Sequence, residues 1–477
     1  MLKRTLKLIA TLSCVFLLVL SDGYAQNLTK VPTNGIWINA QELAALPISG
    51  DGWNRVKAAA DKLAGIEAKG GHESVHDVHV MAAALVAVRL NDDARRRLVA
   101  DHIIKALDNH VENDGNSLSL TRTLPGYIIA ADLVNLKALD PAKDQKFREW
   151  LEFVVYQLKL DNATQVEKHE IRGNNHGTQA GVARIAAAIY LGKLDDLNRA
   201  AAVCRGWLGD RTAYSGFKWG EVCWQVDTSN PVGINPKGAK MTVAGAMRDV
   251  DGVQPDDQRR AGCPDSQTRW PPRTDVHVWG GLQGVVGQAY LLSRAGFDAW
   301  NWGDKAVLRA MSWQYDPQRG NAPASGDDLW ILPLVDFAYG STFWKGETGS
   351  GKQVGWTDWT HAKRGGGGNP GQKQTSVRGA ILNLRSDTPL ANATIQLKVG
   401  NEVRYTTVTN FLGEFTFSPI AAGSYQVLAS KDGFDSASAN VTVAQDEEIL
   451  GVILKLNPIV DSTAPSPPTN VRASVGG

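Results

Sequence analysis

The chain has 477 residues and a formal net charge of +1 at pH 7. This length allows two or three domains, and the balanced charge excludes a general attraction to nucleic acid or to an acidic membrane surface. Of the four cysteines, Cys14 lies in the N-terminal apolar run, so three remain and a disulfide-framework protein is excluded. Anion binding must therefore come from a local cluster of charge.

Residues 1–25 have the pattern of a secretory signal peptide. A basic start with Lys3 and Arg4 precedes an apolar stretch, Leu8 to Leu20, and small residues end the segment at Ala25. The apolar stretch is too short to span a bilayer, and no later segment is apolar enough. We expect a secreted or periplasmic protein without a membrane span.

Residues 40–340 alternate amphipathic helical patterns with short polar breaks, within a domain that we expect to cover residues 26–345. Apolar residues recur at three- and four-residue spacing in 51–64, 76–90, 93–110, 121–136, 144–160, 178–191, 194–207, 278–295, 304–313 and 329–339. No strand is followed by a crossover helix, which excludes a doubly wound sheet and favours helix on helix. Antiparallel helix pairs of this number can close into an (α/α) toroid, an incomplete barrel with a cleft at one end.

One long segment, residues 208–276, interrupts the helical pattern. It is rich in Gly, Pro, Arg and Asp, and the one strand pattern in it covers residues 217–226. A loop this long in a compact domain is usually functional or disordered, and its Trp and Phe residues argue against disorder. We expect a folded wall of the cleft, in which Cys223 and Cys263 could pair while Cys204 stays a buried thiol.

The C-terminal part has a different pattern. Residues 346–374 read as a Gly-rich linker, and short apolar or alternating runs between turns predict a small antiparallel β-sandwich at 375–457. The turn segments 410–413, 423–425 and 431–434 resemble the carboxypeptidase regulatory-like domain. Residues 458–477 read as a Pro-rich tail or the start of a fibronectin type III domain.

Two motifs indicate competing chemistries. His72-Glu73-Ser74-Val75-His76 matches HExxH, in which two histidines one helical turn apart share a zinc ion. Gly70 and Gly71 place His72 before the helix start, so a zinc peptidase is a remote alternative. Paired acids at Asp327-Asp328, or at Asp249 and Asp251, could serve a glycoside hydrolase of toroid type, which is the second alternative.

The most informative stretch is Arg172-Gly-Asn-Asn-His-Gly177, just before a helix rich in Ala and Gly. Asn or His side chains at a helix start are well placed to meet an anion. Other polar residues fall on loops or helix starts near the presumed cleft, and they are Arg248, Arg259, Arg260, Arg273 and His277. This set suits an acidic sugar polymer. Cleaving a uronate by β-elimination requires donors that neutralise the carboxylate, a base and an acid.

Asn174-Asn175-His176, followed by Gly177-Thr-Gln-Ala-Gly, resembles the Asn-Asn-His segment of the alginate lyase domain family. Members of this family are secreted (α/α) toroid lyases acting on alginate or glucuronan. Further segments are similar to one branch of the family, in the same order along the chain: 122–133, 206–211, 255–260, 278–284, 294–300 and 326–330.

The resemblance implies roles for individual residues. Asn175 and His176 would neutralise the uronate carboxylate, with His176 also a candidate base, and Arg260 or Arg248 would help to bind it. The catalytic Tyr of the family has no counterpart before Val278, where the chain reads Arg273-Thr-Asp-Val-His277. His277 is our candidate for proton transfer, and the alternatives are Tyr127 or Tyr214 from elsewhere in the chain, or an altered site. The remaining candidate substrate-binding residues are Arg172, Arg122, Tyr127, Arg273, Trp279 and Gln283.

We therefore expect a monomeric polysaccharide lyase for mannuronate- or glucuronate-containing polymers, with no metal or other cofactor. A catalytically inactive carbohydrate-binding homologue is the remaining alternative.

Overall fold

The structure, a computed structural model, describes residues 27–32, 35–114, 116–220, 223–261, 263, 270–271, 274–347, 349, 354–362, 375–409, 413–417, 420–444 and 447–459. The predicted signal peptide, Arg273, the tail from residue 460 and most of the predicted linker lie outside the described residues. No helix in the described ranges is both long and apolar enough to cross a bilayer.

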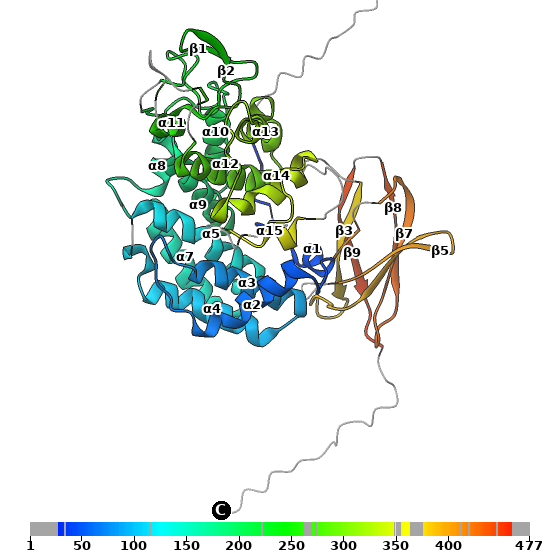
Figure 1. The fold of residues 1–477 in the computed structure, drawn as a ribbon. Helices are drawn as coiled ribbons and strands as arrows, with labels where there is room; N and C mark the ends of the chain where they lie inside the picture. The colour runs from blue at the N-terminus through cyan, green and yellow to red at the C-terminus, as the bar shows by residue number, and fades with distance from the viewer. Residues whose placement is uncertain are drawn as a thin grey trace, which may run out of the picture.

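The N-terminal part is helical, as the apolar spacing predicts (Figure 1). Its α-helices are α1 (Ala40–Ala44), α2 (Asp51–Lys62), α3 (His76–Leu90), α4 (Asp93–Asp108), α5 (Ser117–Leu133), α6 (Leu136–Leu139), α7 (Pro141–Tyr156), α8 (Gln165–Ile171), α9 (Asn175–Leu191), α10 (Leu194–Trp207), α11 (Pro255–Gln258), α12 (Val276–Ala295), α13 (Trp302–Tyr315), α14 (Leu332–Tyr339) and α15 (Thr357–Thr360). Closure of these helices into a toroid stays a prediction.

Four helices form a continuous series of neighbours. Helix α3 packs on α5, α5 on α9 and α9 on α12, while α2, α4, α8 and α10 pack against members of this series. A single apolar cluster, with buried residues from Ile36 to Trp359, holds the helices together. The N-terminal halves of these four helices carry the polar residues His76, Arg122, Asn175 and His277.

Glycines on α12 allow it to lie close against α9. A Cβ on Gly284 would be 2.4 Å from Thr178 Oγ1, and a Cβ on Gly287 would be 2.9 Å from Val182 Cγ2. Since the paired positions ascend together along both helices, α9 and α12 run parallel. Their N-termini, at Asn175 and Val276, therefore lie at the same end of the molecule.

The long segment between α10 and α12 is folded. Its hairpin pairs β1 (Lys240–Val243) with β2 (Ala246–Asp249), and Ala244 and Gly245 form the turn with positive φ. The strand predicted at 217–226 is wrong, because the described residues of that stretch contain no strand. A disulfide joins Cys223 to Cys263, and a small apolar cluster around Trp224 packs beside it. Cys204 is buried and free, as predicted.

Residues 354–362, which the sequence pattern places in a linker, pack against the helical core. Trp356 donates its indole N–H to Val78 O (3.1 Å), and Trp359 donates to Pro47 O (2.9 Å). Asp358 on α15 forms an ion pair with Arg55 on α2. We therefore propose that the helical unit extends to residue 362.

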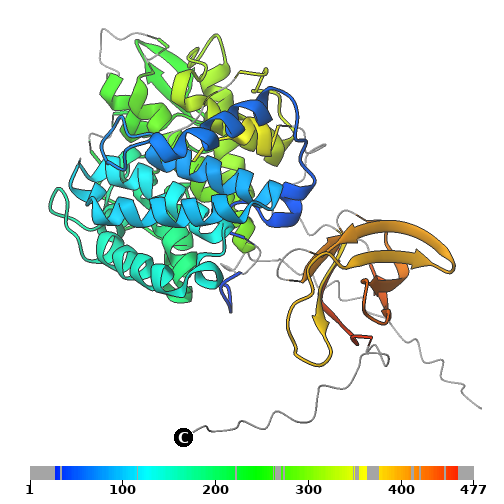
Figure 2. The ribbon, with the colours of Figure 1, turned by 90° about the horizontal axis from the view of Figure 1, so that it is seen from below.

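The C-terminal part is a β-structure of two sheets (Figures 1 and 2). One sheet has the order β6-β3-β9 and the other the order β5-β4-β7-β8. Their strands are β3 (Ser376–Asn383), β4 (Thr394–Val399), β5 (Glu402–Val408), β6 (Glu414–Phe417), β7 (Gly423–Ser430), β8 (Ala437–Val443) and β9 (Glu448–Leu456). Alternate residues, such as Val427 and Ala429, point into one apolar core. The predicted small β domain is confirmed, but β3 and β9 pair in parallel, so its sheets are not purely antiparallel.

Candidate active site

The Asn-Asn-His segment begins helix α9. Asn174 is the N-cap, and its side-chain oxygen accepts the His176 N–H at 3.2 Å. Asn175 is the first residue of the helix and is buried, and no hydrogen-bond partner of its Oδ1 is found among the described residues. Gly177 has no room for a side chain, because a Cβ there would lie 1.9 Å from Arg172 O. The sequence thus fixes an amide and an imidazole at a helix N-terminus.

A buried carboxyl group holds the backbone of Asn175. Asp257 on α11 is 1% exposed and its Oδ1 accepts the Asn175 N–H at 3.0 Å. Its Oδ2 would be 2.4 Å from a Cβ on Gly281 of α12, so Asp257 lies between the first turn of α9 and the second turn of α12. Burial raises the pKa of Asp257 well above its ordinary value, with Asp256 and Asp275 adding to the shift and the Asn175 N–H and Arg260 opposing it.

Arg122 from α5 reaches the same place. A Cβ on Gly280 would be 3.4 Å from Asn175 Nδ2 and 3.6 Å from Arg122 Nη2. The missing side chain of Gly280 therefore leaves space beside both donors. Burial lowers the pKa of Arg122, and the carboxylates of Asp327 and Asp328 oppose that shift. Asp328 also accepts a hydrogen bond from Gln283 Nε2 at 2.7 Å, which places the paired acids next to the Arg122–Asn175 cluster.

His277 has the geometry of an oriented imidazole. Asp275 is the N-cap of α12, and its two oxygens accept the backbone N–H and the Nδ1–H of His277, each at 2.9 Å. In the neutral form of the ring, this bond keeps the proton on Nδ1 and leaves Nε2 as the lone-pair acceptor. The side chain of His277 is 36% exposed. His277 is the second residue of α12, and α12 runs parallel to α9, so His277 lies at the same end of the two helices as Asn175.

His176 is neutral at ordinary pH. Burial, reinforced by Arg260, Lys168 and Arg172, lowers its pKa to about 4. Arg260 and Arg172 are exposed, so they supply positive potential at the surface beside a half-buried imidazole. A neutral imidazole can accept a proton, and the surrounding cations favour an anionic ligand.

Four further residues were predicted to bind substrate: Arg248, Trp279, Tyr127 and Arg273. Arg248 lies over the Trp270 ring, with Cζ 5.5 Å from the ring centroid. Trp279 is buried and donates to Ala322 O at 3.1 Å. Tyr127 is completely buried with its hydroxyl 2.8 Å from His76 Nδ1, so it does not face solvent. Arg273 lies outside the described residues.

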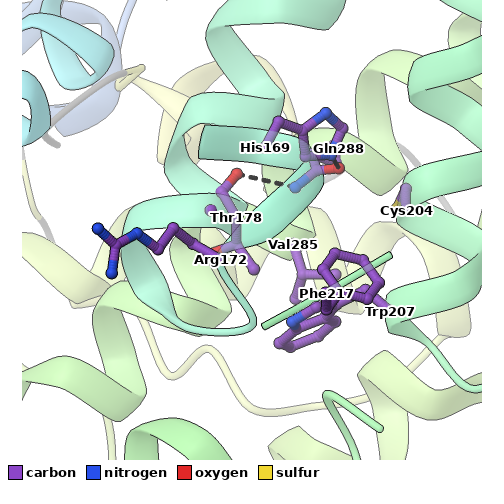
Figure 3. A pocket seen from close by; sticks show the side chains of 9 residues that line it. His169, Arg172, Thr178, Cys204, Trp207, Phe217, Val285 and Gln288 are labelled. Atoms are coloured by element: carbon purple, nitrogen blue, oxygen red, sulfur yellow. Dashed lines mark hydrogen bonds between the residues drawn. The ribbon is translucent and has the colours of Figure 1, made fainter. Parts of the chain in front are cut away.

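A small cavity lies behind the start of α9 (Figure 3). Gln288 bridges the helices there, donating to Thr178 O at 2.8 Å and bonding His169 Nε2 at 3.1 Å. Trp207, Phe217 and Cys204 form the apolar side of the cavity. The cavity has a volume of about 10 Å³, which is room for about one water molecule. It is therefore too small to hold a sugar.

The HExxH motif does not form a helical zinc pair. His72 lies in the turn before α3, where its Nε2 bonds the Asn116 amide at 3.1 Å. His76, the first residue of α3, is buried with its ring nitrogens on Tyr127 and His102. Among the described residues, no group of three or more His, Cys, Asp or Glu side chains is arranged to hold a metal ion.

Sequence reasoning did not single out two residues next to the site, Asp257 and Asp275. Asp257 lies in the Pro255–Arg260 segment, but its contact with Asn175 spans 82 positions along the chain. Asp275 was readable as an N-cap before α12, since Asp at a helix start is a common capping residue.

Two parts of the chain match models of known protein families. Residues 122–222 match the family model described as alginate lyase, and residues 376–455 match the carboxypeptidase regulatory-like domain. No curated protein matches the chain.

Among solved structures, the 5-hydroxyisourate hydrolase of Klebsiella pneumoniae is 23% identical with a TM-score of 0.16, covering 18% of this chain and 93% of the other. The minor pilin of Streptococcus agalactiae is 16% identical with a TM-score of 0.17, covering 20% of this chain and 48% of the pilin. At these TM-scores, neither likeness bears on function. The chain therefore carries an alginate lyase family region, which includes Arg122, Asn175 and His176, and a C-terminal carboxypeptidase regulatory-like domain.

Proposed function

We propose that the protein is a polysaccharide lyase that cleaves a uronate polymer, alginate or glucuronan, by β-elimination. The observation that carries the proposal is the meeting of Asn175 and Arg122 beside Gly280, at the N-terminal end of α9 and α12. An amide, a guanidinium and two helix N-termini at one place form a binding site for a carboxylate. The family match at residues 122–222 supports the same reaction class.

Neutralising the sugar carboxylate makes the adjacent C–H acidic. As the proton at C5 leaves, negative charge develops on the carboxylate, and donors already directed at it stabilise that charge. Asn175 and Arg122 supply these donors in the proposal. The elimination then breaks the bond between C4 and the glycosidic oxygen, which takes a proton.

Two imidazoles are available for the proton transfers. The proposal assigns proton transfer to His277, because Asp275 holds its Nδ1 and leaves Nε2 free to accept or return a proton. His176, whose pKa is lowered to about 4, is neutral and accompanies Asn175 at the carboxylate. Arg260 and Arg172 supply positive potential for binding the polymer.

Substrate assays test the reaction class. The protein is incubated with polymannuronate, glucuronan and a neutral glucan, and the ultraviolet absorbance of unsaturated uronate ends is followed. The proposal predicts this absorbance with one of the two uronate polymers only. Reducing ends without the absorbance would show a hydrolase, and binding without cleavage would show an inactive homologue.

Site variants test the roles. Asn175→Ala and His277→Gln should each lower the elimination rate by about a hundredfold or more. His110→Gln is the control, because the His110 side chain is 71% exposed and its bonding partner is Glu112, outside the proposed site. Equal activity of Asn175→Ala and His110→Gln would contradict the assignment.

We also propose that the protein is exported, and we propose boundaries for its domains and an oligomeric state. A disulfide between Cys223 and Cys263 is typical of proteins in an oxidising compartment, which supports export directed by residues 1–25. We assign the lyase to residues 26–362 and the β domain to residues 375–457, and we expect a monomer. Size-exclusion chromatography of the full chain tests the oligomeric state.

A further inference from the structure

A second polar pocket lies between the turn before α3 and the first half of α5. Its polar lining residues are His72, Ser74, Asp77, Ser119, Arg122 and Thr123. The volume of about 10 Å³ admits a single water molecule or one oxygen of a carboxylate. His72 is exposed and Asp77 is buried, so the pocket runs inward from the surface.

Asp77 is the innermost polar group of this pocket. It is 2% exposed, and no hydrogen-bond partner of its Oδ1 is found among the described residues. Burial raises its pKa to about 8, against hydrogen bonds from the backbone N–H groups of Asp77 and Val78. Asp77 is therefore protonated at neutral pH and can donate a hydrogen bond.

Arg122 links the pocket to the Asn175 centre. Arg122 lines the pocket, and its Nη2 reaches to within 3.6 Å of the Cβ position of Gly280, beside Asn175. Among the described residues its Nε has no hydrogen-bond partner. Protonated Asp77 and the Arg122 side chain offer donors to an anion, and the N-terminus of α3 adds to the positive potential. The Ser119 hydroxyl lines the pocket but donates to Asn116 Oδ1 at 3.4 Å.

We propose that this pocket, lined by Asp77, Ser119 and Arg122, is a second carboxylate subsite, which takes the uronate unit next to the one bound at Asn175. The inference rests on the proposed function and deepens it. Protonated Asp77 donates its O–H to one carboxylate oxygen, and Arg122 lies between two successive sugar acids. The site thereby distinguishes a polymer of consecutive uronates from a chain in which uronates are isolated.

Binding measurements in a variant with slowed turnover test the subsite. In a His277→Gln background, the affinity for an oligomannuronate and for an oligoglucuronate is measured by calorimetry at pH values well below and well above 8. The background should bind more weakly at the higher pH, because ionised Asp77 repels the carboxylate. Asp77→Asn keeps a hydrogen-bond donor at this position and removes the ionisable group. This variant should therefore keep the affinity of the background and lose the pH dependence of binding. Asp77→Leu should weaken binding by about tenfold or more at the lower pH.

Charged and titratable groups also lie on α3, on the turn before it and on the elements packed against it, so a matched control is needed. They are His72 and Glu73 before α3, His76 and His79 on α3, Arg122 and Tyr127 on α5, Arg55, Lys57, Asp61 and Lys62 on α2, His102 and Lys105 on α4, and Glu42 on α1. Asp132→Asn makes the same substitution near the other end of α5, where the Asp132 carboxylate accepts the Ile36 N–H. It should keep the pH dependence of the background.

The outcomes separate the two proposals. If Asp77→Leu binds as tightly as the background, or Asp77→Asn keeps the same pH dependence, the subsite is overturned while wild-type elimination can still stand. If the wild-type protein neither binds nor eliminates any uronate polymer, the proposed function fails, and the subsite fails with it.

Discussion

Replacing Gly280 by Ala separates the proposed site from the packing of its helix. The new methyl group would lie 3.4 Å from Asn175 Nδ2, 3.5 Å from Asn175 Cβ and 3.6 Å from Arg122 Nη2, which are ordinary van der Waals distances. Alanine also favours a helix interior over glycine by roughly 0.5–1 kcal/mol. The free energy of unfolding should therefore stay the same or rise by up to that amount.

Activity should change in the opposite direction. The methyl group occupies the space beside Asn175 and Arg122 in which the proposal places the sugar carboxylate. Weakening that contact by about 1.4 kcal/mol lowers the rate of elimination about tenfold. Urea unfolding followed by circular dichroism gives the stability, and ultraviolet absorbance gives the elimination rate.

Gly284→Ala is the matched control on the same helix. Its Cβ would lie 2.4 Å from Thr178 Oγ1, so overpacking should lower the free energy of unfolding by about 1–3 kcal/mol. The reasoning is refuted if Gly280→Ala destabilises the protein as much as Gly284→Ala does. It is also refuted if Gly280→Ala keeps the parental elimination rate.

Three further predictions concern charge and the long loop. Arg260→Gln should raise the pKa of His176 from about 4, because a nearby cation is removed; an unchanged value in an NMR titration would contradict this electrostatic account. Burial lowers the pKa of His76 to about 3, so neutral His76 contributes its full stability above pH 6.5 and loses it as the pH falls towards 3, a change on the order of 5 kcal/mol. The free energy of unfolding, measured across this pH range, should therefore fall less for His76→Asn than for the wild type. An equal fall in both proteins would show that His76 is not the cause. Replacing Cys223 and Cys263 by Ser should speed hydrogen exchange in residues 209–261 and slow elimination, because Cys263 lies three residues beyond Arg260; unaltered exchange there would show that the disulfide does not hold this segment.

Short-range patterns in the sequence predict much of the helical part. The periodic segments 76–90 and 194–207 match the helices of the structure at both ends. Helix α5 begins at Ser117, four residues before the predicted start, because Asn116 caps it by accepting the N–H groups of Leu118 and Ser119. Helix α8 was missed, although its capping box, Thr164 with Glu167, was a readable signal.

The hairpin β1–β2 shows a different limit. Its turn uses Ala244 with φ of 49°, a conformation that non-glycine residues other than Asn and Asp seldom adopt. The usual Asn-Gly or Asp-Gly hairpin signal is therefore absent from the sequence. The strand pattern at 217–226 competed with it and led to the wrong placement.

The candidate site depends on contacts between distant positions. Asn175 and His176 could be singled out from their place before a helix. Their contacts with Asp257 and Arg122 depend on how α5, α9 and α12 pack, which local pattern does not encode. Tyr127 is a second example. It lies in a segment that is similar to the alginate lyase family, and this position gave no sign that its hydroxyl faces His76 in the core.

The central claim is that the cluster at the start of α9 and α12 promotes elimination from a sugar acid. The most direct measurement is mass spectrometry of oligosaccharides formed from polymannuronate or glucuronan in water enriched in heavy oxygen. Elimination predicts products with an unsaturated end and no heavy oxygen at the newly formed reducing end. Heavy oxygen at the cleavage site, without unsaturation, would show that water breaks the bond and would contradict the account.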